Sequence, residues 1–168
     1  MWYQDPITKI IDNNCPNTIE THLKSGRINT TSLYGAFEIP LLAHFLLYRN
    51  ADVDVLKQLI QLCLNHGADV NQWTMDTDDE WVSPLNIAVG YYLGLCIEKG
   101  AASRKIDILG VISLLIKSGA DPRSEHGTDN GTVIDVINVF RPPVSPDPDA
   151  VNLISADDMN ILCIIVGC

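Results

Sequence analysis

The clearest pattern along the chain is a pair of residues, mostly apolar, that recurs four positions later and is followed by glycine. Three segments show this pattern: 18–26, 59–67 and 111–119. Positions i, i+1, i+4 and i+5 lie on one face of an α-helix, so each segment predicts an amphipathic helix with one buried side. Glycine just beyond the last turn is typical of a helix that ends in the left-handed conformation.

A further helix is predicted ahead of each of these three, opened by a short phrase that contains proline: Asp5-Pro6-Ile7, Ile39-Pro40-Leu41 and Ser83-Pro84-Leu85. A fourth phrase without proline, Thr132-Val133-Ile134, opens the helix that precedes the last one. Proline suits the first turn of a helix, where its missing N–H would be unpaired in any residue. A last helix is predicted over 156–166. The chain therefore divides into four units of two helices within one domain over 1–168, at about 1–29, 30–71, 72–123 and 124–168.

Repeated phrases at the unit boundaries resemble those of a known family. His66-Gly67-Ala68-Asp69-Val70-Asn71 and Ser118-Gly119-Ala120-Asp121 follow the second helices of two units, and Ser83-Pro84-Leu85 opens a first helix. These phrases resemble the ankyrin repeat, a β-turn followed by two antiparallel helices. The resemblance implies an all-α fold, an ankyrin-repeat solenoid of four helix-turn-helix units.

Units two to four are longer than the family's spacing implies, and the excess lies between their two helices. In unit three the first helix is expected to run on to residue 99 and to stop at 100–102, with Ser103 capping the next helix. In unit four the prolines of segment 141–149 forbid a helix and predict an extended loop. We therefore expect elongated helices or inserted loops in repeats two to four.

The segment between units two and three has the composition of a binding site. Residues 72–81 hold four acidic residues, two tryptophans and one methionine, with no basic residue. In a stack of helix pairs this segment would border an open concave surface, where aromatic residues anchor a partner and charges steer it. The predicted centre of the partner site is Trp73, Met75, Asp76, Asp78, Asp79, Glu80 and Trp81. The alternative is that the tryptophans only pack the segment onto its neighbour while the acids solvate it.

The turn segments of the other units add further candidates for the same surface. Tyr34, Phe37 and Glu38 place two aromatic residues and one acid in the first of them. Glu125 and Asp129 lie in the polar segment that follows unit three. We include all five residues in the predicted partner site.

Composition and charge narrow the classes of partner and the compartment. Eleven basic and 21 acidic residues give a net charge of −10, which argues against nucleic acid or an anionic membrane as partner. No stretch reaches the ~18 apolar residues of a membrane span, and the first residues lack the features of a secretion signal. Five dispersed cysteines without a C-x-x-C pair fit reduced thiols. We expect a cytoplasmic protein.

Motifs that carry catalytic or metal chemistry are missing from the sequence. The four histidines are dispersed, and none stands in H-E-x-x-H. There is no phosphate-binding glycine loop and no G-x-S-x-G. The neighbouring acids Asp157 and Asp158 fit the first turn of the last helix, where the helix dipole favours them. We expect no enzymatic activity, no metal and no cofactor.

These observations predict a non-enzymatic protein–protein interaction module that binds a basic partner through an acidic and aromatic surface. The chain is similar to small bacterial ankyrin proteins that neutralise a cognate toxin, which implies that it neutralises its partner. The alternative is a scaffold, adaptor or host-directed effector that recruits a partner. Because the last helix is apolar nearly all round, either the proline-rich loop covers it or a second copy does, forming a homodimer through this helix.

Overall fold

The computed structural model describes residues 6–34, 38–47, 52–75, 81–98, 101–124, 132–140 and 154–167. Within these ranges the chain is mostly helical, so the predicted all-α class is confirmed. The helices are α1 (Pro6–Asp12), α2 (Pro16–Lys24), α3 (Leu41–Leu47), α4 (Val53–Asn65), α5 (Pro84–Ile97), α6 (Ala102–Lys117), α7 (Val133–Phe140) and α8 (Ala156–Val166). The strands are β1 (Leu33–Tyr34), β2 (Ile39–Pro40), β3 (Thr74–Met75) and β4 (Trp81–Val82).

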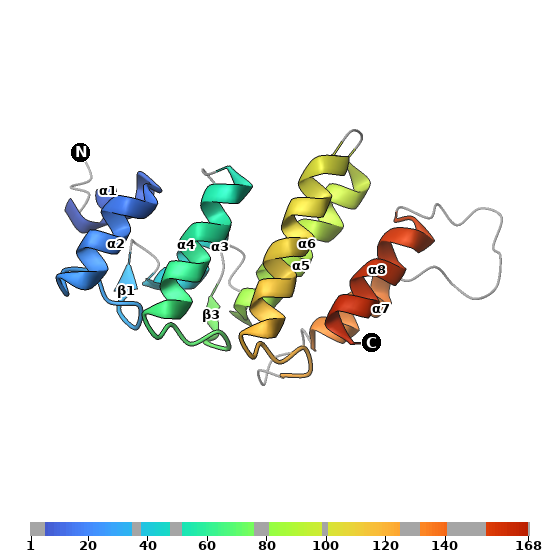
Figure 1. Ribbon diagram of the computed structural model, residues 1–168. Helices are drawn as coiled ribbons and strands as arrows, with labels where there is room; N and C mark the ends of the chain where they lie inside the picture. Colours follow the sequence, from blue (N-terminus) through green and yellow to red (C-terminus); the bar gives the residue numbers. More distant parts are fainter. Residues whose placement is uncertain are drawn as a thin grey trace, which may run out of the picture.

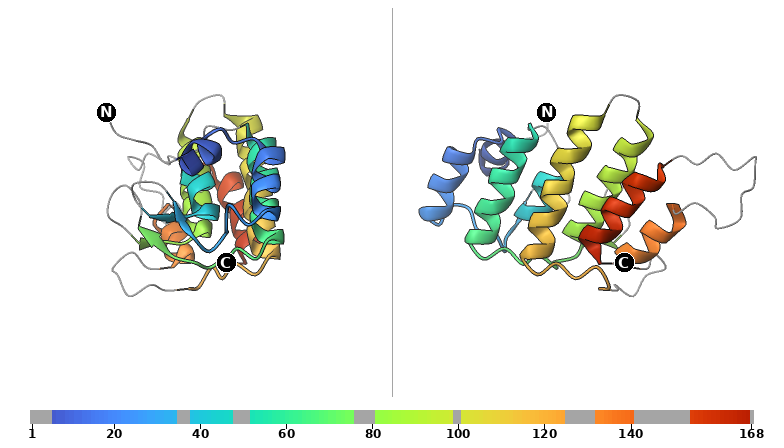
Figure 2. Two further views of the ribbon diagram at one scale, coloured as in Figure 1. Left: turned by 90° about the vertical axis from the view of Figure 1, so that its left-hand side faces the viewer. Right: turned by 45° about the vertical axis from the view of Figure 1, so that its right-hand side comes forward.

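The helices stand in successive pairs that follow one another in a row (Figure 1). Seen along the row, α2, α4 and α6 form one layer, the odd-numbered helices a second, and the short strands lie beyond them at one edge (Figure 2). Each helix packs on its counterpart in the next pair, α2 on α4, α4 on α6 and α6 on α8. The odd-numbered helices do the same from α3 to α7. The strands are therefore carried on the outer edge of a stacked helical body.

Glycine ends the second helix of each pair, as the sequence pattern predicts. Gly26, Gly67, Gly119 and Gly167 have φ angles of 72°, 82°, 96° and 83°. After α4 the N–H of Gly67 donates to the carbonyl of Leu64 at 3.1 Å, and Ala68 donates to Cys63 at 2.9 Å. The same two bonds recur after α6 in the second Gly-Ala-Asp phrase. These paired bonds satisfy the last carbonyls of the helix, and the positive φ favours glycine.

Side chains fix the start of several helices, but not that of α6. Ser83 and Asn86 form a reciprocal capping box at α5, and Ser155 accepts from the backbone of Asp158 at α8. The prediction that Ser103 caps α6 was wrong. The helix begins at Ala102, after a buried Ala101 that makes no cap, so packing rather than a hydroxyl sets its start. Glu98 is extended, so α5 also ends earlier than expected.

The paired apolar positions form the core of the stack. Leu59, Ile60 and Cys63 of α4 are fully buried, and Val111, Ile112 and Leu115 occupy the equivalent places in α6. Burial raises the pKa of the Cys63 thiol to about 12, so this cysteine packs as a small neutral hydrophobe. Truncation of a leucine at such a site typically costs about 2–5 kcal/mol.

The last helix matches its prediction, since α8 spans 156–166 and Asp157 and Asp158 lie in its first turn. Ile161 and Ile164 of α8 are exposed, and the homodimer through this helix stays a prediction. The proline-rich segment 141–149 lies outside the described residues. Among the helices that the structure describes, none has the length and apolar character needed to cross a membrane.

Candidate functional site

Two antiparallel hairpins lie next to each other on one edge of the helical stack. In the first, Leu33 of β1 pairs with Pro40 of β2; in the second, Met75 of β3 pairs with Trp81 of β4. Each hairpin leads directly into the first helix of a pair, α3 or α5. Strands β2 and β3 are in contact, so the two hairpins stand side by side.

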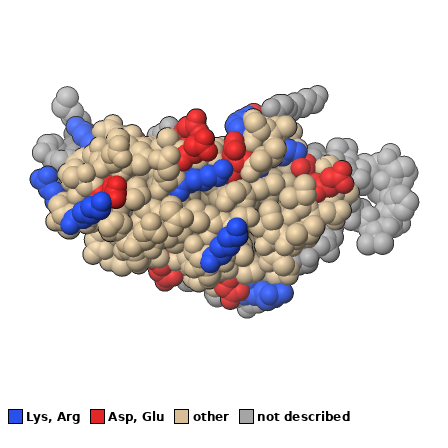
Figure 3. All heavy atoms as spheres, in the orientation of Figure 1, with Lys and Arg blue, Asp and Glu red and all other residues tan. Residues whose placement is uncertain are grey.

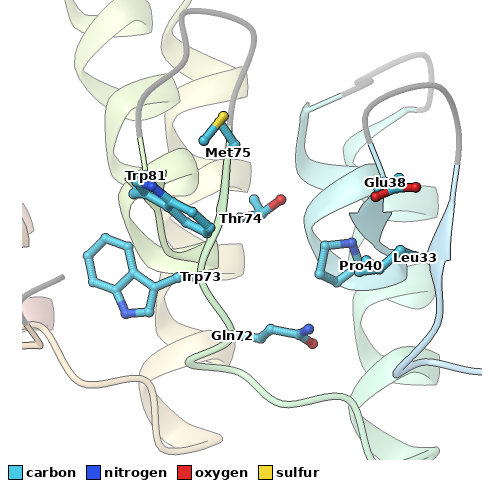
Figure 4. Close-up of a pocket in the computed structure, with 8 residues that line it drawn as sticks. All are labelled: Leu33, Glu38, Pro40, Gln72, Trp73, Thr74, Met75 and Trp81. Carbon is cyan, nitrogen blue, oxygen red and sulfur yellow. The ribbon is translucent and has the colours of Figure 1, made fainter. Parts of the chain in front are cut away.

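A hollow of about 330 Å³ lies between the hairpins (Figure 4). The described residues that line it are Leu33, Glu38, Pro40, Gln72, Trp73, Thr74, Met75 and Trp81. The first three come from the β1–β2 hairpin, and the others come from the β3–β4 hairpin and the residues just before it. Segments about 40 residues apart in the sequence thus form one site.

The lining of the hollow combines polar groups with large apolar and aromatic side chains that are partly exposed. Leu33 is 51% exposed and Met75 39% exposed, although both are large apolar side chains. Trp73 and Trp81 are half-buried, while Pro40 and Thr74 are buried. Exposed apolar side chains grouped beside aromatic rings mark interaction surfaces rather than solvated ones.

Glu38 brings the one ionisable side chain among the described lining residues. It is exposed, and its φ angle of 52° places it in the left-handed region, where side chains other than glycine are uncommon. Such backbone strain is concentrated at functional sites because packing elsewhere must offset it. The strained turn holds a carboxylate at the edge of an apolar and aromatic hollow.

The structure brings together four of the predicted site residues: Trp73, Met75, Trp81 and Glu38. Tyr34 is not among them. It is buried, and its hydroxyl both accepts from the N–H of Asn29 and donates to the Asn29 carbonyl, each at 2.7 Å, so it braces the turn before the hairpin. The remaining predicted residues lie outside the described ranges: Phe37, Asp76, Asp78, Asp79, Glu80, Glu125 and Asp129.

Sequence reasoning missed Leu33, Pro40, Gln72 and Thr74 as lining residues. Three of them carried a signal that could have been used, since Thr74, like Gln72, lies within the segment 72–81. Leu33 stands one residue before Tyr34 in a two-residue strand, and alternation of strand faces would have turned it outward as Tyr34 turned in. Gln72 lies in the segment already singled out for its composition.

A second cluster of polar residues joins α8 to the pair before it. Lys105 of α6 donates to both carboxylate oxygens of Asp158, at 2.8 and 2.7 Å, and Ser155 donates to the same carboxylate at 2.9 Å. The buried Tyr92 of α5 donates to the Asp158 carbonyl at 3.2 Å. Burial acts to raise the pKa of Asp158, but the bonds from Lys105 and Ser155 outweigh it and the pKa is lowered. This cluster holds elements together and does not border the hollow.

Other ionisable groups among the described residues pack between helices or lie on the helical face, away from the hollow. His44 of α3 is buried and its Nε2 lies 3.2 Å from the Asp12 carboxylate, while burial lowers the pKa of the imidazole. On the face formed by the even-numbered helices, Lys and Arg are interspersed with Asp and Glu (Figure 3). Among the residues with a described placement, no three His, Cys, Asp or Glu side chains are grouped to hold a metal ion.

Among the described residues, the hollow groups exposed apolar side chains, half-buried indole rings and one carboxylate from two separate segments. Side chains of these kinds are suited to contact with another molecule. Comparison with protein-family models found no match for the chain, and comparison with curated proteins found none either.

Proposed function

We propose that this protein is a non-enzymatic protein–protein interaction module that binds a basic partner protein through the hollow between the two hairpins. The observation that carries the proposal is the grouping of Leu33, Met75 and the two tryptophans at one exposed place. Aromatic and apolar anchors surrounded by polar groups are the usual composition of an interface centre.

The proposal includes the finer description of the fold, an ankyrin-repeat solenoid of four units in the cytoplasm. Its support is the recurrence of one local structure along the chain. The Gly-Ala-Asp phrases at Gly67 and Gly119 end their helices through the same pair of backbone bonds. Hairpin, first helix and second helix follow in that order twice, and in such stacks the hairpin edge faces the partner.

The negative charge of the chain, and of the segment that joins β3 to β4, supports a basic partner protein. Besides Glu38, residues 76–80, which join β3 to β4, contain four carboxylates in the sequence. The whole chain carries a net charge of −10. An acidic binding edge raises the rate of encounter with a basic surface, and that gain falls as salt screens it, with a Debye length of about 8 Å at physiological ionic strength.

Binding of a basic partner serves one of two functions. In the first, the module neutralises its partner by covering it, as in the small bacterial ankyrin proteins that the chain resembles. In the second, it acts as a scaffold, adaptor or host-directed effector that recruits the partner. A toxin-like reading frame next to the gene would favour neutralisation, and the partner's own activity, measured with and without this protein, separates the two.

The test is a comparison of partner capture by the wild-type protein and by variants of the hollow. Leu33→Asn is matched by Ile106→Asn, because Ile106 is a similarly exposed apolar residue on α6, away from the hairpins. A partner captured by the wild type should be lost by Leu33→Asn and kept by Ile106→Asn. Trp73→Ala should weaken binding of the purified partner by about 2 kcal/mol or more if the ring is covered in the complex.

Melting curves on the same preparations show whether each variant is still folded. If both asparagine variants bind like the wild type, or if binding is lost only in variants that have unfolded, the hollow is not the partner site.

The acids should act on the rate of association rather than on stability. Asp78→Asn combined with Asp79→Asn should slow binding of the purified partner and flatten its dependence on salt, while the melting temperature stays nearly unchanged. Stopped-flow measurements from low to high salt check this. An unchanged association rate at low salt would show that this segment does not steer the partner.

A further inference from the structure

The chemistry of the hollow restricts what it can bind. Among the described residues that line it, one is acidic, none is basic, and two are tryptophans. Indole rings attract cations through their electron-rich faces, and a carboxylate attracts them by charge. The indole rings and the carboxylate therefore both favour a positively charged ligand.

The indole rings and the carboxylate come from opposite hairpins. Trp73 and Trp81 belong to the β3–β4 side, where the ring of Trp73 points away from the first hairpin, while Glu38 lies across from Trp81 beside Leu33 and Pro40 (Figure 4). A side chain inserted between the hairpins would have the Trp81 ring as an aromatic wall on one side and a carboxylate on the other. A ligand that is flat and charged at its tip, with an apolar stem, satisfies both walls and the aliphatic side chains between them.

Covering the hollow also makes an unpaired carboxylate costly. Glu38 is now exposed to water, but a partner seated on Leu33 and Met75 would remove part of that water. A carboxylate that loses its water without gaining a cation opposes binding, so a partner with only apolar groups here would be disfavoured. A volume of about 330 Å³ is at the lower end of ligand pockets and suits one long side chain rather than a folded segment.

We infer that the hollow receives an arginine side chain of the partner, its guanidinium stacked against Trp81 and paired with Glu38. The inference rests on the proposed function, because it names the group by which the partner is recognised. Arginine fits better than lysine because its guanidinium is planar, stacks on aromatic faces and binds a carboxylate through two parallel bonds. Gln72 and Thr74 add amide and hydroxyl groups at the same hollow.

The inference can be tested without the partner by titrating the whole protein with blocked amino acids. The probes are N-acetyl-arginine amide, the lysine analogue, and N-acetyl-citrulline amide, which is close to arginine in shape but has no charge. The readout is the indole N–H signals of Trp73 and Trp81 in a nitrogen–proton correlation spectrum, with the third tryptophan, Trp2, as reference. The arginine probe should shift the Trp81 signal saturably at millimolar concentration and the Trp73 signal less, and the lysine and citrulline probes should shift the Trp81 signal less than arginine, citrulline least.

The variant Glu38→Gln should weaken binding of the arginine probe by about fivefold, near the upper value measured for an exposed ion pair. It keeps the length of the side chain, so the strained turn is disturbed as little as the chemistry allows. Glu20→Gln, which removes a partly exposed acid on α2 that is paired with Lys24, is the control and should bind the probe like the wild type.

Equal shifts from arginine and citrulline, no saturable shift from any probe, or an unchanged titration of Glu38→Gln would each overturn the inference. These results leave the proposed function to its own test, because partner capture by Leu33→Asn and Ile106→Asn does not depend on which group enters the hollow. Conversely, loss of the proposed function in that test would not alter the outcome of the titration.

Discussion

Two lysine–aspartate pairs join successive helices of the same layer, yet their surroundings differ. Lys57 of α4 reaches Asp107 of α6 at 3.9 Å, with side chains 34% and 41% exposed. Lys105 of α6 reaches Asp158 of α8 at 2.7 Å, with side chains 24% and 17% exposed. The first is a long contact in water, and the second is a short one enclosed by Tyr92 and Ser155.

These two pairs show that residue type alone does not determine how much an ion pair contributes to stability. An exposed ion pair is screened by water and contributes about 0–1 kcal/mol. In an enclosed pair, the loss of one partner leaves the other charge in a poorly hydrated place, which is strongly destabilising even where the intact pair itself adds little. The attachment of α8 should therefore depend on Asp158 far more than the contact of α4 with α6 depends on Asp107.

The largest expected effect is that of Asp158→Ala. It removes the partner of Lys105 and an acceptor of Ser155 and should lower the free energy of unfolding by about 2 kcal/mol, less than the 3–5 kcal/mol of a fully buried pair because both side chains keep some exposure. Asp107→Ala should cost less than about 1 kcal/mol. Urea unfolding of the two variants measures the contrast, and equal losses would contradict it.

A smaller effect is expected from Tyr92→Phe. The ring stays in the core, and only the hydroxyl is lost, which donates to the Asp158 carbonyl at 3.2 Å and lies 3.3 Å from the carboxylate of the same residue. Removal of one such bond should cost about 1 kcal/mol. Combining Tyr92→Phe with Asp158→Ala should give a loss smaller than the sum of the two, because both act on one cluster. Strict additivity in urea unfolding would show that the hydroxyl acts independently of the carboxylate.

A further pair between helices, His44 of α3 with Asp12 of α1, differs from both lysine–aspartate pairs in its response to pH. Burial lowers the pKa of His44 despite the opposing effect of the Asp12 carboxylate. The unfolded chain therefore binds a proton more readily than the folded one, so stability is complete above about pH 6.5 and falls as the pH is lowered through that value. The enclosed Lys105–Asp158 pair should lose its contribution only at much lower pH, because the pKa of Asp158 is lowered.

Melting at pH 7 and pH 5.5 separates these two groups. His44→Gln should show a smaller decrease over that interval than the wild type, whereas Asp158→Asn should show the same decrease. A wild-type melting temperature independent of pH over this interval, or an equal decrease in His44→Gln, would refute the assignment to His44.

The features that could be predicted from the sequence are those written into short segments. Gly67 and Gly119 revealed the helix ends because local backbone geometry requires glycine there. The composition of 72–81 pointed to Trp73, Met75 and Trp81 at the hollow. The opposite wall could not be predicted as a wall, because Leu33 and Pro40 reach the site only when the two hairpins stack.

The enclosed cluster was missed for the same reason. Asp158 was explained by the helix dipole alone, since Lys105 and Tyr92 lie 53 and 66 residues before it and no local pattern links them. For Tyr34 the error was the reverse, because the sequence suggested a role in the site and the structure shows a local one. Its aromatic character suggested a contact with a partner, but its hydroxyl closes a local turn at Asn29.

The smallest effect concerns Gly110, in the middle of α6 beneath the exposed pair. A Cβ added there would lie 2.9 Å from the Cε atom of Lys57, so the lysine must move. Because that atom is near the end of a flexible side chain, the movement costs little free energy. The Lys57–Asp107 contact that it disturbs contributes little to stability. Replacing glycine within a helix by alanine gains up to about 1 kcal/mol. Gly110→Ala should therefore stabilise the protein by about 0.5 kcal/mol.

Urea unfolding of Gly110→Ala, alone and with Asp107→Ala, gives the answer. The gain in stability should persist in the double variant, because the Lys57–Asp107 pair contributes almost nothing to stability. If Gly110→Ala instead destabilises the protein, and Asp107→Ala removes that cost, then the Lys57–Asp107 contact is worth more than its distance and exposure indicate. The two lysine–aspartate pairs would then differ in solvent exposure without differing in what they contribute.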